Sequence, residues 1–190
     1  EPSKRWDGFK GQVIENDIDG PEADWADALK AASDISADWF FRDSLEFYRN
    51  APHAERIVDL FSRYFHALGE TDGAVVVHCA AGKDRTGMIC AITHHIAGVP
   101  RDDTLADYLA TNAAADVEKR IEFLGPWIRD LTGVTVDDAG LRQAVSVHEA
   151  FLAEAFAVMT ERHGSVDNYL AEVLGVDATL RDAIAARILR

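Results

Sequence analysis

The chain has 190 residues, of which 48% are hydrophobic and 27% charged, and its formal net charge is −14. This length predicts one domain with a substantial core over residues 1–190, in the ordinary globular range of composition. The acidic balance argues against binding to nucleic acid or to anionic membranes, and no apolar run approaches the roughly 20 residues that span a bilayer.

The first half of the chain opens with an expected strand and continues into helices. Residues 12–18 (QVIENDI) predict the strand, which a turn at Asp19-Gly20-Pro21 closes. Short helical pieces follow over residues 22–50, and their aromatic run at 38–48 fits either core or a cover over a pocket. Residues 53–68 predict a clear amphipathic helix, because their apolar residues recur at helical spacing.

A second expected strand covers residues 74–77 (AVVV), where β-branched residues stand between Asp72-Gly73 and a turn at Gly82. An apolar helix is expected next, at residues 86–97. Further helices are expected at residues 102–112, 114–131 with a break at Gly125-Pro126, 145–163, 165–174 with a serine cap, and 177–189.

Two strands among many helices predict an α/β fold with a central, mostly parallel sheet flanked by helices. Two strands are few for such a sheet, which usually needs more partners. We therefore expect that strands preceding Glu1 are missing and that the domain is truncated at its N-terminus.

The stretch from His78 to Gly87 (HCAAGKDRTG) places one of only two cysteines between the second strand and the following helix. The backbone N–H groups of a tight turn at a helix N-terminus converge on a small volume that binds a tetrahedral oxyanion. The same groups would lower the pKa of the Cys79 thiol, and Arg85 would grip two phosphate oxygens. The other cysteine, Cys90, lies within the helix and is expected to be structural.

A nucleotide-binding loop of the Walker type fits this stretch poorly. That loop requires a serine or threonine directly after Gly-Lys and a second glycine five residues earlier. Asp84 follows Gly82-Lys83 here, and Val77 stands in the place of the earlier glycine.

The stretch fits the H-C-x-x-G-x-x-R-[ST]-G signature of the cysteine-dependent protein tyrosine phosphatases. It most resembles the bacterial tyrosine and phosphoinositide phosphatases related to the mycobacterial secreted phosphatase. The segments FYRNAP (47–52), DYLATN (107–112) and HGSVDNYLAEVLGV (163–176) resemble the same family. An N-terminal Arg-Asp-Leu-Gly-Gly-like stretch, which such relatives carry, does not occur in this sequence.

The resemblance implies a phosphomonoester hydrolase that needs neither metal nor cofactor. Cys79 would be the nucleophile that forms a cysteinyl-phosphate, and Arg85 would stabilise the phosphoryl group. Thr86 would donate to the sulfur, and His78 would orient the loop. The phosphate would lie in the loop formed by Ala80, Ala81, Gly82, Lys83, Asp84 and Arg85.

The proton for the leaving group is assigned to Asp84, by resemblance to relatives that carry an aspartate inside the phosphate loop. Asp34, Asp38 and Asp43 remain alternatives, because the helical stretch before His53 that carries them could bring any of them over the site. The adjacent His94 and His95 are expected to be structural, since neighbouring helical residues point about 100° apart.

Phosphotyrosine in a protein is the expected substrate, with dual-specificity or phosphoinositide activity as further options, the latter favoured by Lys83. Two other functions stay open: a noncatalytic phosphate-binding or phosphoprotein-binding module, and an inositol polyphosphate phosphatase. We expect a soluble protein without stable membrane insertion, located in the cytoplasm, while secretion without a recognisable leader stays open.

Overall fold

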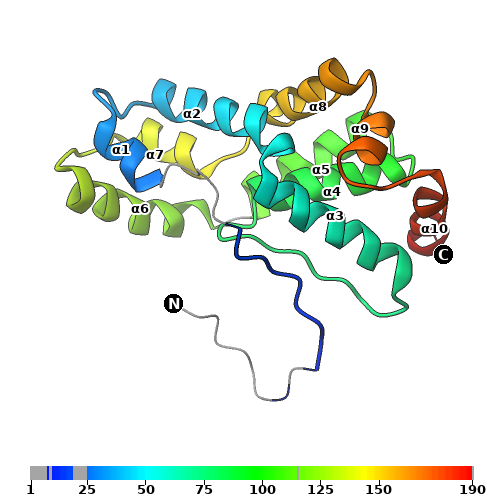
Figure 1. Ribbon diagram of the computed structural model, residues 1–190. Helices are drawn as coiled ribbons and strands as arrows, with labels where there is room; N and C mark the ends of the chain where they lie inside the picture. The colour runs from blue at the N-terminus through cyan, green and yellow to red at the C-terminus, as the bar shows by residue number, and fades with distance from the viewer. Residues whose placement is uncertain (1–7, 9, 19–24, 115, 190) are drawn as a thin grey trace.

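A computed structural model of the chain describes residues 8, 10–18, 25–114 and 116–189, and within these residues the regular structure is entirely helical (Figure 1). The helices are α1 (Trp25–Ala31), α2 (Ala37–Asn50), a 3-10 turn η1 (Ala51–His53), α3 (Glu55–Glu70), α4 (Asp84–Ile96), α5 (Arg101–Ala114), α6 (Val117–Thr132), α7 (Asp138–Val145), α8 (Glu149–His163), α9 (Val166–Glu172) and α10 (Ala178–Ile188). None of these helices is both long enough and apolar enough to cross a membrane.

The expected α/β fold with a central parallel sheet is therefore wrong for the described residues. Residues 12–18 and 74–77 are extended, but they have no strand partner there. The β-branched run 74–77 was expected to be buried on both faces, yet Val76 is 85% exposed while Val75 and Val77 pack on the core. Alternation of this kind fixes an extended backbone, whereas a sheet also needs a neighbouring strand. The turn expected at residues 19–21 lies outside the described residues.

The protein has two hydrophobic cores, one at each end of α2, and this helix contributes side chains to both (Figure 1). Phe40, near its start, packs with α1, α6 and α7, and Tyr48, near its end, packs with α3, α4, α5, α8 and α9. Both rings are at most 2% exposed. The aromatic run at 38–48 is thus part of both cores, and a core position was one of the two roles expected for it.

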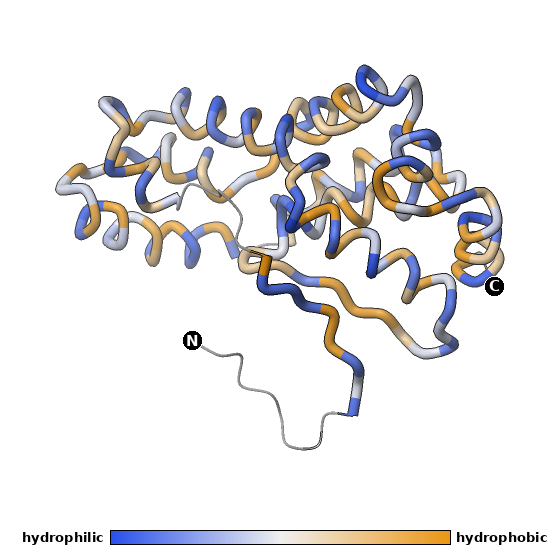
Figure 2. Tube along the Cα trace, viewed as in Figure 1, coloured by the Kyte–Doolittle hydropathy of each residue, from blue (hydrophilic) through white to orange (hydrophobic). Residues whose placement is uncertain are grey.

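The larger core surrounds α4, the helix that follows the cysteine loop. Met88, Ile89 and Ile92 are at most 2% exposed, so this helix is held on its inner side along its length. Against it packs α3, whose buried residues recur at intervals of three and four positions. Figure 2 shows apolar and polar residues alternating along α3, as this spacing requires. Packing of this density fixes the position of the loop at the start of α4.

Most of the expected helices are confirmed, with small shifts at their ends. The serine cap is confirmed as well: Ser165 accepts a hydrogen bond of 3.0 Å from the backbone of Asn168 at the start of α9. The break expected at Gly125-Pro126 is wrong, because α6 continues through Pro126. A proline removes one backbone donor from a helix, and the packing of Ile128 into the smaller core retains α6 around that defect. Helix α7 was not expected.

Candidate active site

The cysteine loop is reached through an extended segment that leaves the end of α3. Val75 and Val77 anchor this segment on the core, and Cys79 continues the same alternation, so its side chain is half-buried. Gly82 has a φ of +65°, a left-handed conformation that suits glycine. The turn then leads directly into α4, whose first residue is Asp84. The geometry is that of a turn that delivers a thiol to a helix N-terminus.

The Cys79 thiol lies beside donors that favour its ionised form. The Thr86 hydroxyl donates to the Cys79 Sγ over 3.3 Å. Burial of the thiol opposes ionisation, but hydrogen bonds from the Thr86 hydroxyl and from the backbones of Thr86 and Gly82, with the charge of Arg85, outweigh it and lower the pKa of Cys79. Burial raises the pKa of Cys90 instead. The two cysteines are thus chemically distinct, and Cys79 is the one suited to nucleophilic attack.

The remaining loop residues differ in their exposure. The backbone from Ala80 to Gly82 is open to solvent, as is His78, while Arg85 is half-buried. Across the turn, the Arg120 guanidinium on α6 donates from Nη2 to the carbonyl of Ala81 over 2.9 Å. This contact, which sequence reasoning missed, joins α6 to the loop. No local signal marks it, because 39 positions separate the two residues.

Lys83 and Asp84 form an ion pair that faces the protein interior. The Lys83 Nζ lies 3.1 Å from the Asp84 Oδ1 and 3.4 Å from the carbonyl of Ser146, and the Lys83 side chain is only 11% exposed. The Ser146 carbonyl belongs to a segment that Asn112 fixes by two hydrogen bonds of 2.8 Å with the Val147 backbone. Lys83 therefore does not extend from the rim of the loop into solvent.

The Asp84 carboxylate has a further partner that sequence reasoning missed. The Tyr48 hydroxyl donates to the same Oδ1 atom over 3.1 Å, and it lies 2.7 Å from the Tyr108 hydroxyl. Two helices distant in sequence, α2 and α5, thus meet at the first residue of α4. The only sequence signal for this meeting is that both tyrosines lie in segments that resemble the phosphatase family.

The alternative aspartates lie on or beside α2. Asp34 and Asp38 are exposed, and Asp34 accepts a hydrogen bond of 2.9 Å from Ser36. Asp43 is half-buried and accepts one of 3.2 Å from the Trp25 indole. Burial raises the pKa of Asp43 despite that hydrogen bond, and the charges of Lys83 and Asp84 also act on it. Asp43 is thus the member of the three that lies near the loop.

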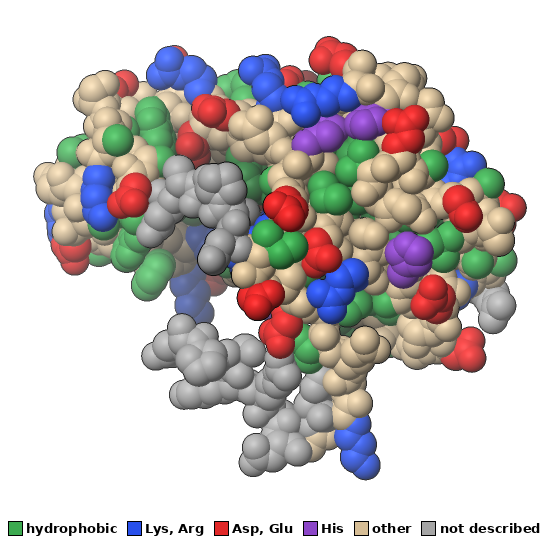
Figure 3. All heavy atoms as spheres, viewed as in Figure 1, with side chains coloured by type: hydrophobic (Ala, Val, Ile, Leu, Met, Phe, Trp, Pro, Cys, Tyr) green, Lys and Arg blue, Asp and Glu red, His purple; other side chains and the backbone are tan. Residues whose placement is uncertain are grey.

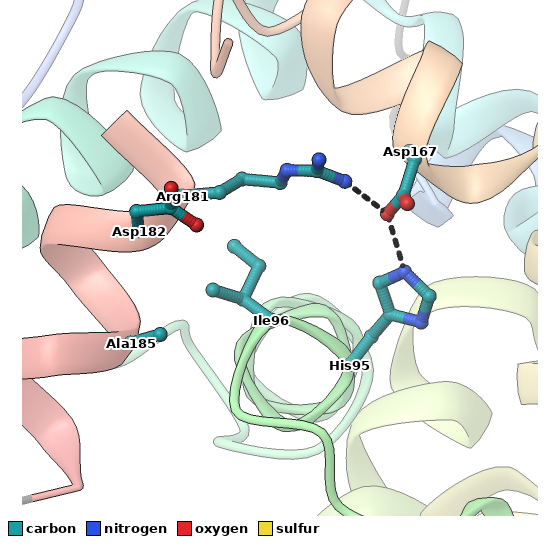
Figure 4. A pocket seen from close by; sticks show the side chains of 6 residues that line it. All are labelled: His95, Ile96, Asp167, Arg181, Asp182 and Ala185. Atoms are coloured by element: carbon teal, nitrogen blue, oxygen red, sulfur yellow. Dashed lines mark hydrogen bonds and ion pairs between the residues drawn. The ribbon is translucent and has the colours of Figure 1, made fainter. Parts of the chain in front are cut away.

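A separate pocket of about 280 Å³ lies at the other end of α4, where this helix meets α9 and α10 (Figure 4). Asp167 Oδ1 there accepts from the His95 Nε2 at 2.9 Å and pairs with the Arg181 Nη1 at 2.6 Å. At 1.5 Å per helical residue, His95 lies roughly 16 Å along the axis from Asp84. The pairing ties three helices together, which is the structural role expected for His95.

The described residues contain no metal cluster, and the face in Figure 3 carries charges of both signs. Among the residues that the structure describes, no three His, Cys, Asp or Glu side chains are grouped so that they could hold a metal ion. Acidic and basic side chains are interspersed over the face in Figure 3. At the loop itself, the Arg120 guanidinium bonds to the Ala81 carbonyl, and the charge of Arg85 acts on the Cys79 thiol.

Comparisons with known proteins find a matching family and several named relatives. A family model described as "Tyrosine phosphatase family" matches residues 6–190. A provisionally named tyrosine-protein phosphatase of Cupriavidus necator is 30% identical over 151 residues, which cover 78% of this chain and 50% of the relative. The triple specificity protein phosphatase PtpB of Mycobacterium tuberculosis is 32% identical over 108 residues, or 52% of this chain and 38% of that protein.

A tyrosine-protein phosphatase of Nostoc commune is 43% identical over 49 residues, which cover 25% of this chain and 17% of the relative. The matched part of this chain thus spans about half the length of the Cupriavidus relative and less of the other two. The family match, in contrast, extends over nearly the whole chain and includes the cysteine loop. The chain therefore belongs to the tyrosine phosphatase family.

Proposed function

We propose that this chain hydrolyses phosphomonoesters through a cysteinyl-phosphate on Cys79, with phosphotyrosine in proteins as its main substrate. The observation that carries the proposal is the environment of the Cys79 thiol, whose pKa the neighbouring donors lower. The location of this thiol in the signature loop of a tyrosine phosphatase family chain gives the environment its functional meaning.

The first step forms one bond and breaks another at phosphorus. The Cys79 thiolate attacks, an S–P bond forms, and the P–O bond to the leaving group breaks while the Asp84 carboxyl donates a proton to the departing oxygen. Arg85 and the loop N–H groups stabilise the equatorial oxygens of the transferring group. The product is an alcohol or phenol together with the cysteinyl-phosphate.

The second step restores the enzyme. Water attacks phosphorus, the Asp84 carboxylate takes up the proton of that water, and the S–P bond breaks to release inorganic phosphate and the thiolate. The Thr86 hydroxyl, 3.3 Å from the sulfur, stabilises the leaving thiolate through its hydrogen bond. Every bond change is thus assigned to a group in or beside the loop.

The orientation of Lys83 supports phosphotyrosine over phosphoinositides. A lysine that selected a second phosphate would extend from the rim, but this ammonium group lies against Asp84 and the Ser146 carbonyl. The net charge of −14 also opposes approach to an anionic lipid surface. Dual-specificity and phosphoinositide activities are therefore secondary parts of the proposal, to be measured in the same assay.

The test is phosphate release from a phosphotyrosine peptide, a phosphoserine peptide and phosphoinositide vesicles, with a chelator present. The Cys79→Ser variant should lose all release, because a hydroxyl has no low-pKa anion to attack with. Cys90→Ser is the matched control and should retain activity, since burial raises the pKa of that thiol. Equal activity in wild type and Cys79→Ser would refute the mechanism, and phosphate binding without turnover would favour the noncatalytic module.

The assignment of the general acid has its own comparison. Asp84→Asn should slow the hydrolysis of esters with poor leaving groups, whereas Asp43→Asn should leave that hydrolysis unchanged. The opposite pattern would transfer the role to Asp43, whose pKa burial raises. Both substitutions preserve side-chain shape, so the comparison isolates proton transfer.

A further inference from the structure

Asp84 is connected to a buried pair of tyrosines that the proposed reaction does not itself use. Its Oδ1 atom lies 3.1 Å from the Tyr48 hydroxyl and 3.1 Å from the Lys83 ammonium, while the Tyr48 hydroxyl lies 2.7 Å from that of Tyr108. Each side chain comes from a different helix or from the loop. The carboxyl group is therefore held from several directions.

The two rings are fixed by packing. Tyr48 is fully buried and stacks on Phe151 of α8, with ring centroids 5.6 Å apart and an interplanar angle of 28°. Tyr108 is 3% exposed and lies directly above Gly87, where an added Cβ would fall 2.8 Å from two of its ring carbons. A side chain at Gly87 would thus occupy the space of the ring. Neither hydroxyl can move far without disturbing α4.

The direction of the hydrogen bonds follows from the number of protons available. Burial, with the charge of Asp84, raises the pKa of both tyrosines, so each hydroxyl retains its single proton. Tyr48 donates that proton to the Asp84 Oδ1. Tyr48 can then only accept from Tyr108, which makes the chain run from Tyr108 through Tyr48 to Asp84.

A carboxyl group held in this way has distinguishable oxygens. The Oδ1 atom accepts hydrogen bonds from Tyr48 and Lys83, as the carbonyl oxygen of a carboxylic acid does. A proton taken up by the carboxyl group therefore resides on Oδ2. The tyrosine chain thereby selects which oxygen delivers the proton.

We propose that Tyr48 and Tyr108 are positioning residues that fix Asp84 as the proton donor to the leaving group. The proposal rests on the proposed function, because it presupposes that Asp84 is the general acid. It goes beyond that function in assigning the effectiveness of the acid to two residues outside the loop. Neither tyrosine touches the substrate in this account.

The test is Tyr48→Phe, which retains the buried ring and removes the hydroxyl. For p-nitrophenyl phosphate, whose leaving group needs little protonation, kcat/KM should fall by no more than about twofold. For phenyl phosphate, kcat/KM should fall by about tenfold or more, which is part of the rate enhancement of about 10²–10⁴-fold that general acid catalysis contributes. An equal factor for both esters would indicate a structural role alone and overturn the proposal.

Two further variants separate positioning from folding. Tyr64→Phe is the matched control, because the Tyr64 hydroxyl also bonds to α4, at the Thr93 Oγ1 over 3.2 Å, and should not change the leaving-group dependence. Tyr108→Phe should shift the leaving-group dependence in the same direction as Tyr48→Phe, by a smaller factor. It provides the readout if the Tyr48 variant unfolds, and an unchanged dependence in it would count against the proposal.

A double variant connects the effect to Asp84. In an Asp84→Asn background, Tyr48→Phe should have no further effect on the leaving-group dependence, because the acid that it positions is already absent. A full additional effect there would overturn the proposal. If the wild-type protein shows no Cys79-dependent hydrolysis, the proposed function is refuted. If hydrolysis is normal and Tyr48→Phe leaves the leaving-group dependence unchanged, only the role of the tyrosines is refuted.

Discussion

The substitution Gly87→Ala tests the packing that holds the tyrosine chain. Its new Cβ would lie 2.8 Å from both the Cδ2 and the Cε2 of Tyr108. Carbon atoms in contact lie about 3.5–4.0 Å apart, so the ring must retreat by about 1 Å. Tyr108 is 3% exposed and its hydroxyl is bonded to Tyr48, which leaves the ring little room.

The expected cost combines two opposing contributions. Overpacking a buried site costs about 1–3 kcal/mol, while replacing glycine by alanine within a helix gains about 1 kcal/mol. Gly87→Ala should therefore reduce the free energy of unfolding by about 1 kcal/mol, and by up to about 2 kcal/mol if the surrounding core does not yield.

Urea denaturation of wild type and variant measures this change. Gly73→Ala is the control, because its Cβ would find only the Thr71 Oγ1, at 3.6 Å, and that position is exposed. The cost of Gly87→Ala should also diminish in a Tyr108→Leu background, where the contacted ring carbons are gone. A Gly87→Ala protein more stable than wild type, or a cost that is the same in the Tyr108→Leu background, would refute the close contact between Gly87 and Tyr108.

Three other substitutions probe separate contacts. Tyr169→Phe should destabilise the fold by about 1–3 kcal/mol, because it leaves the buried carbonyl of Pro52 without the 2.7 Å hydrogen bond from the Tyr169 hydroxyl; chemical denaturation measures this, and an unchanged midpoint would contradict it. Thr86→Ala should raise the pKa of Cys79 by removing a donor to the thiolate, so the pH profile of iodoacetamide alkylation at Cys79 should move to higher pH; a profile that stays in place argues against the Thr86 contribution. Burial lowers the pKa of His53 below its ordinary 6.5, so the unfolded chain binds a proton at this side chain more tightly than the folded protein does. The stability of the fold should therefore be intact above about pH 6.5 and should fall as the pH drops through the folded-state pKa. In His53→Asn that acid loss should diminish, and an identical pH dependence in the variant would exclude His53 as its source.

The helices were predictable because their signal is local. In α3, the buried residues Ile57, Phe61, Phe65 and Leu68 recur along one face, so the pattern predicted this helix to within two residues at each end. The continuation of α6 through Pro126 was missed for the opposite reason. Whether a helix survives a proline depends on what packs around it, and that packing comes from distant parts of the chain.

The absence of a sheet from the described residues could not be read from local sequence. Residues 74–77 have the composition of a strand and are extended (Figure 1), but only Val75 and Val77 pack on the core, whereas burial on both faces was expected and Val76 is exposed. A strand, however, is defined by its hydrogen-bonded neighbour. The pattern predicted the backbone conformation correctly and the pairing wrongly.

The loop and the tyrosines illustrate the same difference within the site. Cys79 and Thr86 are seven positions apart within one signature, and the resemblance to the phosphatase family predicted the contact that the structure contains. Tyr48 and Asp84 are 36 positions apart, and Tyr48 and Tyr108 are 60 apart. These contacts arise only when α2, α4 and α5 pack together, so one sequence does not reveal them.

Identification of the residue that accepts the phosphoryl group tests the proposed role of Cys79 most directly. Wild-type protein mixed with excess p-nitrophenyl phosphate should be quenched in acid within the first turnover and analysed by peptide mass spectrometry. A cysteinyl-phosphate mechanism predicts a burst of p-nitrophenol and a phosphoryl group on Cys79, with neither in Cys79→Ser. A phosphoryl group on another residue, or undiminished hydrolysis by Cys79→Ser, would contradict it.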